Sequence, residues 1–455
     1  MKRESFGSRL GFILVSAGCA IGIGNVWKFP YICGAYGGAA FILIYLLFLI
    51  ILGIPVLVCE FAVGRGSRKS VALSFDELQS KNGKWTPLKF IGIIGCYMLM
   101  MFYTTVGGWL MYYCYKGIRG SFVNASSDNI STQFSQMLTD VPTMLFWTIL
   151  ICVIGFAVCM FGLNNGIERV TKVMMTALIL IMVVLAIRSV TMTGAGEGIR
   201  FYLIPDFHKM VESGIGNVVF AALSQAFFTL SIGIGAMLIF GSYLDQSRSL
   251  TGEAVNIMLL DTFVALTAGF IIIPACFSYG IEPGAGPSLI FITLPNIFAQ
   301  MSGGRIWAFL FFLFLTFAAL STIIAVFENL VMFNMELLGW RRKKSVLVCA
   351  TLIIILSIPC VLGFNVWSGV QLLGEGSTIM DLEDFIVSNN LLPLGSLGYV
   401  LFCTRKNGWG WDAFIKEVNT GSGMKFPKTL RGYVSYGIPA IIIVIYLKGY
   451  YDKFK

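Results

Sequence analysis

The sequence predicts an all-α polytopic membrane protein, because its composition and its long apolar runs exceed what a soluble fold can bury. Of its 455 residues, 57% are hydrophobic and 12% are charged, whereas roughly 25% of residues are charged in a typical soluble domain. The mean hydropathy is +0.83. This composition excludes a soluble enzyme, a nucleic-acid-binding protein and a disulfide-stabilised secreted module.

Eleven apolar runs supply the predicted transmembrane helices, since one crossing needs about 20 apolar residues. They cover residues 8–35, 39–64, 87–116, 141–160, 166–189, 215–243, 253–279, 304–336, 345–363, 379–404 and 428–447. The 11 cysteines fall in or at the ends of these runs. We therefore interpret them as small buried side chains rather than as disulfides or metal ligands.

The distribution of basic residues predicts the orientation in the membrane. With the N-terminus inside, alternate loops place 22 of the 32 Lys and Arg residues on the cytoplasmic side and 9 outside, and Lys28 lies within the first run. Basic residues are enriched in cytoplasmic loops. We expect a multi-pass protein of the cell membrane with a cytoplasmic N-terminus and, after eleven crossings, an external C-terminus.

Three loops carry patterns of their own. Residues 70–78 and 206–214 combine apolar and polar side chains in the way that short surface helices do. Residues 282–301 contain Pro283, Pro287 and Pro295 between two apolar runs. This last pattern indicates a re-entrant segment or a hairpin that caps the outer face.

Matching glycine triplets occur near the middle of the first and sixth runs, as Gly22-Ile23-Gly24 and Gly233-Ile234-Gly235. Glycine destabilises a helix by about 1 kcal/mol relative to alanine, although it is also common where membrane helices pack closely. Irregular backbone at membrane depth persists only where it is buried in protein or lines a cavity. Because the triplets lie five runs apart, we predict two interrupted helices in the inverted halves of a transporter.

Several motifs resemble those of the neurotransmitter:sodium symporters, especially the bacterial members with eleven helices. In family order they are GIGNVWKFP at 22–30, GGAAF at 37–41, GIP at 53–55, Glu60, QAFFTLS at 225–231, SYL at 242–244, GAGP at 284–287 and LP at 294–295. The resemblance implies the LeuT-type fold, a 5+5 inverted repeat of which helices 1 and 6 are broken. It implies one transporter domain over 1–455, with repeats at about 8–189 and 215–404 and an extra helix at about 428–447.

The resemblance also implies two Na⁺ sites, since Na⁺ is a hard cation that prefers oxygen ligands. The first would be formed by the carbonyl of Ala20 and the side chains of Asn25, Thr229 and Asp261, and would be completed by the substrate carboxylate. The second would be formed by the carbonyls of Gly18, Ile21 and Ala318 and the hydroxyls of Ser321 and Thr322. If the first helix were unbroken, these two hydroxyls would more simply bond to their own helix.

Asp261 is the most informative single residue. It stands in an apolar run, and a carboxylate inside a membrane helix is unfavourable and marks function by default. The resemblance implies that animal relatives have a neutral residue in this region and use a bound chloride. A fixed carboxylate near Tyr45, Gln225 and Thr229 would neutralise Na⁺ directly, so we expect chloride-independent transport.

The break in the first helix would present backbone N–H groups to a substrate carboxylate. By the resemblance, the hydroxyl of Tyr103 also binds that carboxylate. The other substrate-binding positions that it implies are Cys19, Ala20, Gly22, Gly24, Met100, Phe228, Thr229, Ser231, Ile234, Thr322, Ala325 and Val326. This lining carries no charge, so it favours a neutral, hydrophobic or aromatic L-amino acid over a charged one.

Two ion pairs are expected to act as gates. Lys28 would face Asp384 at the outer end, as a point charge rather than as the bidentate fork of an arginine. Arg3 would face Glu336 at the inner end, although surface ion pairs are often incidental. The fifth run has Thr176 where many relatives have a proline, which weakens the expectation that this helix unwinds.

These features predict a Na⁺-coupled symporter that imports amino acids by alternating access, in a lipid bilayer, as a monomer or weak dimer. A proton- or other cation-coupled carrier of the same fold is the nearest alternative. An ion channel would need a continuous polar pore. An enzyme would need a nucleophile, base or metal set, which the sequence lacks, and no nucleic-acid partner is expected.

Overall fold

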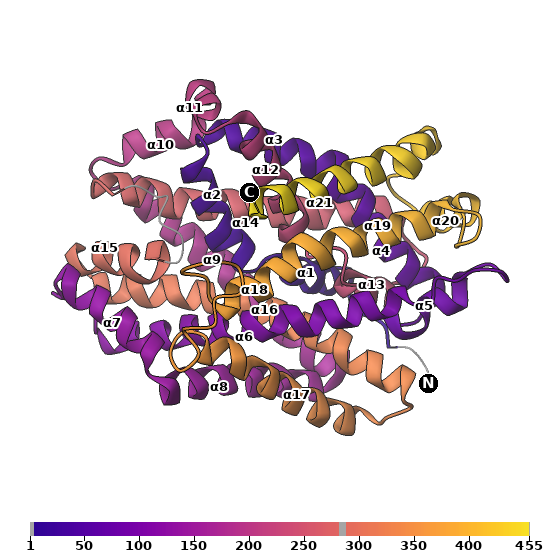
Figure 1. Ribbon diagram of the computed structural model, residues 1–455, viewed down its shortest axis with the longest axis horizontal. Coiled ribbons are helices and arrows are strands. Elements are labelled where there is room, and N and C mark those ends of the chain that lie inside the picture. Colours follow the sequence, from indigo (N-terminus) through magenta and orange to yellow (C-terminus); the bar gives the residue numbers. More distant parts are fainter. Residues whose placement is uncertain (1–3, 282–287, 455) are drawn as a thin grey trace.

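The computed structural model describes residues 4–281 and 288–454, which form a bundle of helices with no β-strand among them (Figure 1). Nine of the described helices are long and apolar enough to cross a membrane, and a bent pair makes a tenth candidate. Two shorter helices, α12 (Ile215–Thr229) and α13 (Ala236–Ser242), together occupy the predicted sixth run. The predicted all-α polytopic fold is confirmed, and the count of eleven holds approximately.

The spans follow the predicted runs to within a few residues, except that the last one begins with short helical turns from Lys428 and continues to Phe454, seven residues past the predicted end. They are α1 (Arg9–Ala20) with α2 (Phe29–Ala35), α3 (Ala39–Phe48) with α4 (Ile54–Ser67), α6 (Leu88–Arg119), α8 (Val141–Met160), α9 (Arg169–Val190), α12 with α13, α14 (Leu250–Ser278), α16 (Gly304–Leu337), α17 (Arg342–Leu362), α18 (Ile379–Ile386) with α19 (Leu392–Thr404), and α21 (Ile438–Phe454). Thr176 does not interrupt α9, because threonine keeps the backbone N–H that a proline lacks, and its hydroxyl donates to the carbonyl of Lys172 at 2.8 Å.

Six short helices lie outside the spans. The two predicted ones are present as α5 (Val71–Leu78) and α11 (Phe207–Glu212). Their caps explain where they begin, since the side chains of Ser70 and Asp206 accept hydrogen bonds from the first turn. The others are α7 (Ser127–Thr139), α10 (Ala195–Leu203), α15 (Leu294–Gln300) and α20 (Trp411–Val418).

The proline-rich loop at 282–301 is described only in part. A π-helical turn, Leu289–Thr293, leads into α15 there, and residues 282–287 lie outside the described residues. In Figure 1, α7, α10 and α15 lie toward the left end of the bundle, whereas α5 and α20 lie toward the right end. The spans run between these two ends.

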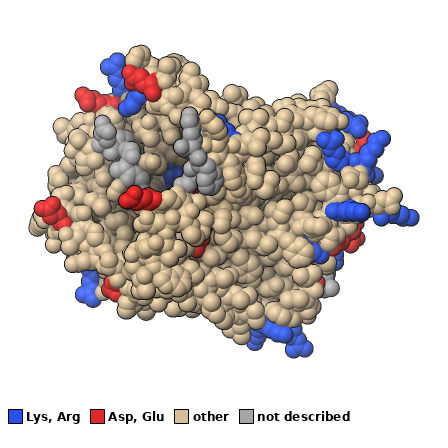
Figure 2. Space-filling model, in the orientation of Figure 1, with Lys and Arg blue, Asp and Glu red and all other residues tan. Residues whose placement is uncertain are grey.

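The surface between the two ends is apolar. Val173, Leu180, Val184 and Ile187 of α9 are all exposed, and Figure 2 shows charged side chains gathered near the two ends with a broad uncharged face between them. A soluble protein rarely exposes so wide an apolar surface, so this belt fits contact with lipid. The 11 cysteines are free and buried, as expected.

The first span is broken at mid-length. α1 ends at Ala20, Ile21 is extended (φ −70°, ψ 96°), and the helical chain that resumes at Gly24 is bent by 57°. A Cβ atom added at Gly22 would lie 2.7 Å from Oγ1 of Thr322. The glycine is therefore needed for the close approach of α16.

The sixth span is broken in a different way, by residues in the left-handed region between α12 and α13. These are Ser231 (φ 51°), Gly233 (φ 102°) and Gly235 (φ 75°). Glycine adopts this region without penalty, whereas a serine there is held under strain by its surroundings. Both predicted interruptions are confirmed.

The second break packs tightly against α19. A Cβ atom added at Gly395 would lie 2.7 Å from the carbonyl carbon of Gly233 and 3.1 Å from its Cα. Because both neighbours are backbone atoms, neither can move without shifting a helix.

We expect Gly395→Ala to lower the free energy of unfolding by about 1–3 kcal/mol, the usual effect of overpacking. Gly432→Ala is the matched control, since a Cβ atom there meets nothing within 4 Å. The thermal midpoint of the purified protein in detergent measures both. Equal midpoints for the two variants would contradict the close packing of α19 on the break.

Candidate substrate and sodium sites

The two helix breaks lie against each other and exchange hydrogen bonds. The amide of Gln225, on α12, donates to the carbonyl of Gly24 at 2.9 Å, and the hydroxyl of Ser231 donates to the carbonyl of Cys19 at 3.2 Å. The carbonyl of Cys19 is one that the break in the first span leaves without a helical partner, whereas the carbonyl of Gly24 also accepts from the N–H of Phe29. The two halves of the chain are thereby joined at mid-membrane.

Asn25, Thr229 and Asp261 form a buried group that we call the first oxygen cluster. The amide of Asn25 donates to Oδ1 of Asp261 at 2.8 Å, and the hydroxyl of Thr229 donates to Oδ2 at 3.0 Å. All three side chains are fully buried, and Ala20 lines the adjacent cavity. The carboxylate charge of Asp261 is shared among hydrogen bonds rather than opposed by a basic side chain.

Gly18, Ile21, Ala318, Ser321 and Thr322 form the second oxygen cluster, between α1 and α16. The hydroxyl of Thr322 lies 3.3 Å from the carbonyl oxygens of both Gly18 and Ile21, and that of Ser321 lies 3.4 Å from the carbonyl oxygen of Ile21. The same hydroxyls also reach Ala318 within their own helix, at 2.9 Å from Ser321 and 3.4 Å from Thr322. The two hydroxyls therefore bond to a carbonyl of their own helix and also contact carbonyls at the broken end of α1.

The second cluster has the ligand chemistry of a hard cation site. Three carbonyl and two hydroxyl oxygens converge there from two helices, and hard cations are bound by oxygens of this kind. The set carries no net charge, which suits a monovalent cation better than a divalent one.

A small cavity lies between the two oxygen clusters. It is lined by Ala20, Gly22, Gly24, Leu99, Tyr103, Phe228, Ser231, Ile234, Thr322 and Leu392, and the space open to the centre of a water molecule is about 10 Å³. The hydroxyl of Tyr103 accepts a hydrogen bond from the N–H of Ile23 at 2.9 Å. In this conformation the cavity is too small to hold an amino acid.

Eight of the predicted substrate-binding residues line this cavity, and two lining residues were not predicted. Cys19, Met100, Thr229, Ala325 and Val326 are buried but are not among the lining residues. α6 contributes Leu99 to the lining, four residues before Tyr103. Met100, three residues before Tyr103, lies on the same helix face by the same periodicity, so helical spacing alone does not choose between the two, and Leu392 comes from a distant helix.

The outer ion pair is present. Nζ of Lys28 lies 3.8 Å from Oδ2 of Asp384 and 4.2 Å from the ring centroid of Phe228. A cavity of about 290 Å³ opens outward from this point and includes Trp27 and Asp381 in its wall. Lys28 therefore contacts both Phe228, which lines the small cavity, and the outer helix α18, a double contact that the sequence did not indicate.

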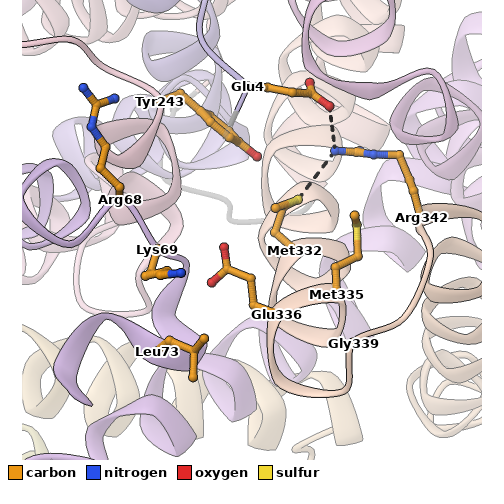
Figure 3. Close-up of a pocket in the computed structure, with 10 residues that line it drawn as sticks. All are labelled: Glu4, Arg68, Lys69, Leu73, Tyr243, Met332, Met335, Glu336, Gly339 and Arg342. Carbon is orange, nitrogen blue, oxygen red and sulfur yellow. Dashed lines mark hydrogen bonds and ion pairs between the residues drawn. The ribbon is translucent and has the colours of Figure 1, made fainter. Parts of the chain in front are cut away.

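The inner ion pair cannot be followed in full, because Arg3 lies outside the described residues. Its predicted partner, Glu336, accepts hydrogen bonds from both the N–H and the hydroxyl of Ser70 at 2.7 Å. Figure 3 shows Glu336 and Lys69 pointing toward each other across a cavity of about 300 Å³. Glu336 thus ties α16 to the start of α5.

Residues 4–9 are fixed across the inner end by acidic side chains that were not predicted. Glu168 accepts from the N–H of Gly7 at 2.8 Å, and Glu253 pairs with Arg9 at 3.0 Å. Glu4 accepts from the N–H of Leu163 at 2.7 Å. The only sequence signal was the presence of glutamates at the ends of apolar runs, which does not reveal their partners.

The profile of the Sodium:neurotransmitter symporter family matches residues 3–133 and 129–450. The chain belongs to this family. It is 35% identical over 448 residues to the sodium-dependent transporter YhdH of Bacillus subtilis (strain 168), covering 98% of this chain and 97% of that protein. It is 29% identical to the sodium-dependent serotonin transporter of Drosophila melanogaster, covering 98% of this chain and 76% of that protein.

The fold is also that of a solved structure. The crystal structure of MhsT in complex with L-phenylalanine matches this chain with a TM-score of 0.89 at 35% identity, covering 98% of this chain and 100% of that one. The resemblance inferred from the motifs is confirmed. The chain is a multi-pass, sodium-dependent secondary transporter and not an enzyme.

We expect Thr322→Val to raise the Na⁺ concentration that gives half-maximal thermal stabilisation by roughly tenfold, because a hydrogen-bonding group on a charged ligand contributes about 1.5–3 kcal/mol. Thr316→Val is the matched control, since its hydroxyl donates only to Phe312 of the same helix, at 2.7 Å. Melting curves recorded over a range of NaCl, with choline chloride keeping ionic strength constant, measure the difference. An unchanged Na⁺ dependence in Thr322→Val would exclude this hydroxyl as a ligand.

Proposed function

We propose that the protein is a Na⁺-coupled symporter that imports neutral hydrophobic or aromatic L-amino acids by alternating access. The observation that carries the proposal is a small cavity with an uncharged lining, placed between two oxygen clusters where two broken helices meet. A zwitterionic substrate needs both polar backbone for its charged ends and an apolar space for its side chain. The lining offers both kinds of group, and its helices would have to move apart to admit a substrate, because the space is about 10 Å³ in this conformation.

The proposed orientation of the substrate follows from the polar and the apolar parts of the cavity lining. Its carboxylate would lie toward the first helix break, near the hydroxyl of Tyr103 and the first oxygen cluster. Its side chain would lie against Leu99, Ile234 and Leu392. A charged side chain in that position would lose its hydration without gaining a partner. The L-phenylalanine named for the MhsT structure has the side chain that such a space favours.

Coupling would arise because Na⁺ and substrate complete each other's sites. We propose two Na⁺ sites, one in each oxygen cluster. An ion in the first cluster would share the substrate carboxylate, and an ion in the second cluster would brace α1 against α16 and favour the outward-open state. Substrate binding would then let Phe228 and the pair of Lys28 and Asp384 close above it. A membrane potential contributes about 2.3 kcal/mol per charge per 100 mV to inward movement.

The proposal includes a cell-membrane location with the N-terminus in the cytoplasm and the C-terminus outside, and a monomer or weak dimer in the bilayer. The one competing function is a carrier of the same fold driven by protons or another cation. The fully buried carboxylate of Asp261 is the feature that favours it, since a carboxyl group can bind a proton in place of a metal ion.

The test of the function is uptake of labelled amino acids into proteoliposomes. We expect leucine, phenylalanine and tryptophan to be taken up at least tenfold faster than lysine or aspartate, because the cavity has no charged lining. Replacement of external Na⁺ by choline should abolish uptake. Uptake that persists in choline and follows an imposed proton gradient would establish the competing function instead.

Chloride independence is tested separately. We expect equal uptake in chloride and gluconate buffers, because the carboxylate of Asp261 supplies the negative charge beside the first cluster. Asp261→Asn should lose most uptake in gluconate. Glu375→Gln, which changes an exposed carboxylate in the loop before α18, is the control. A several-fold loss of wild-type uptake in gluconate would contradict the role given to Asp261.

A further inference from the structure

Three acidic residues lie on the short outer helix α18, and two of them have evident partners. Asp381 caps the helix, since it accepts hydrogen bonds from the N–H and hydroxyl of Thr378 at 2.7 and 2.8 Å. Asp384 pairs with Lys28 at 3.8 Å and accepts from the hydroxyl of Ser388 at 2.7 Å. The position of Asp381 is thus explained by its cap on α18, and that of Asp384 by its ion pair with Lys28.

The third acid, Glu383, is buried without such partners. It is 2% exposed, and neither of its carboxylate oxygens accepts a hydrogen bond from an N–H or O–H group within the described residues. No Lys or Arg in residues 4–281 or 288–454 forms an ion pair with it. Every other residue of α18 is at least partly exposed.

The surroundings of Glu383 offer no compensating charge. α18 packs against α6, α17 and the π-helical turn Val387–Leu391. The titratable group that faces Glu383 is the thiol of Cys360 on α17, and α6 contributes the uncharged Thr105 beside that thiol. The remaining charged groups of α18 itself, Asp381 and Asp384, are also acidic and so would oppose a second negative charge.

An ionised carboxylate that is removed from water without a partner is strongly unfavourable, and such a group becomes neutral by binding a proton. We propose that Glu383 is a proton-binding site that holds its proton while α18 is packed against α6 and α17, and releases it to the outside when α18 moves to open the outer gate. This inference rests on the proposed function in one respect, namely that the pair of Lys28 and Asp384 is a gate that opens.

The backbone after α18 gives this helix the means to move. The π-helical turn Val387–Leu391 separates α18 from α19, and Pro393 stands in the first turn of α19. Proline removes a helical hydrogen bond, and π-helical turns are frequent at functional sites in helices. The eight residues of α18 are therefore joined to the rest of the span by a weakened segment.

The positions of Asp384 and Glu383 couple the gate to the proton. Adjacent residues on a helix point about 100° apart, so Asp384 lines the outer cavity while Glu383 faces the protein interior. A movement that separates Asp384 from Lys28 also carries Glu383 away from Cys360 and toward water. External acid would then favour the closed gate, and external alkali would favour opening.

Infrared spectroscopy of the purified protein tests the resting state of the site without Na⁺ or substrate. We expect wild-type protein in H₂O and D₂O to show a protonated carboxylic-acid C=O band that Glu383→Gln removes. The matched control, Glu375→Gln, alters an exposed carboxylate and should leave the band unchanged. A spectrum of Glu383→Gln that retains the full wild-type band would overturn the proposal.

Release of the proton is measured with a pH indicator in weakly buffered detergent solution when Na⁺ is added to favour the outward-open state. One carboxyl group carries one proton, so Glu383→Gln should release about one proton fewer per molecule than wild type or Glu375→Gln. Equal release would overturn the coupling to the gate. Glutamine matches the shape of the neutral acid, and Glu383→Met serves as a second variant if Glu383→Gln fails to fold.

The two measurements separate this inference from the proposed function. The infrared band depends on neither transport nor Na⁺, so its presence together with absent amino-acid uptake would refute the symport proposal and leave the proton site standing. Normal Na⁺-dependent uptake together with an unchanged band in Glu383→Gln would refute the proton site alone.

Discussion

The rest of the structure depends on the peptide groups that two broken helices leave unpaired in the middle of an apolar bundle. In lipid, a backbone N–H or C=O without a partner is unfavourable by several kcal/mol. Each break is therefore surrounded by polar side chains from other helices, including Tyr103, Gln225 and Thr322 around the first. Glu60 does the same for the second, since it accepts a hydrogen bond from the N–H of Gly233. The binding chemistry is a consequence of this requirement, because groups that satisfy backbone can also bind an ion or a zwitterion.

Much of the fold could be predicted from the sequence, because long apolar runs determine spans and paired glycines determine where spans break. The missed helices have a physical reason. α7, α10 and α20 are short and amphipathic, and such segments differ little in composition from loops. The site was harder to predict. Its proposed ligands came from a family resemblance, and the register of α6 relative to Tyr103 allows both Leu99 and Met100, so the sequence could not show which of them lines the small cavity. The partners of residues 4–9 could not be predicted either, because Glu168 and Glu253 meet them only through tertiary packing.

The contacts of Lys28 at the outer end of the bundle go beyond a simple ion pair. Lys28 contacts both a carboxylate on α18 and the ring of Phe228. An ammonium group interacts with each as a point charge and does not need the planar geometry of a guanidinium. Phe228, which lines the small cavity, and α18 therefore share a single cation. A movement of α18 would change the contact between this cation and the ring of Phe228.

The burial of all the native thiols has a practical consequence. Each of the 11 cysteines lies in the protein interior, and a thiol shielded from water reacts slowly with maleimides and other thiolate-directed reagents. The wild-type chain is thus a ready background for attaching fluorophores or spin labels at single engineered cysteines on α5, α7 or α20. Distances between such labels would follow the opening of either end in real time, without first replacing eleven residues that help to fill the core.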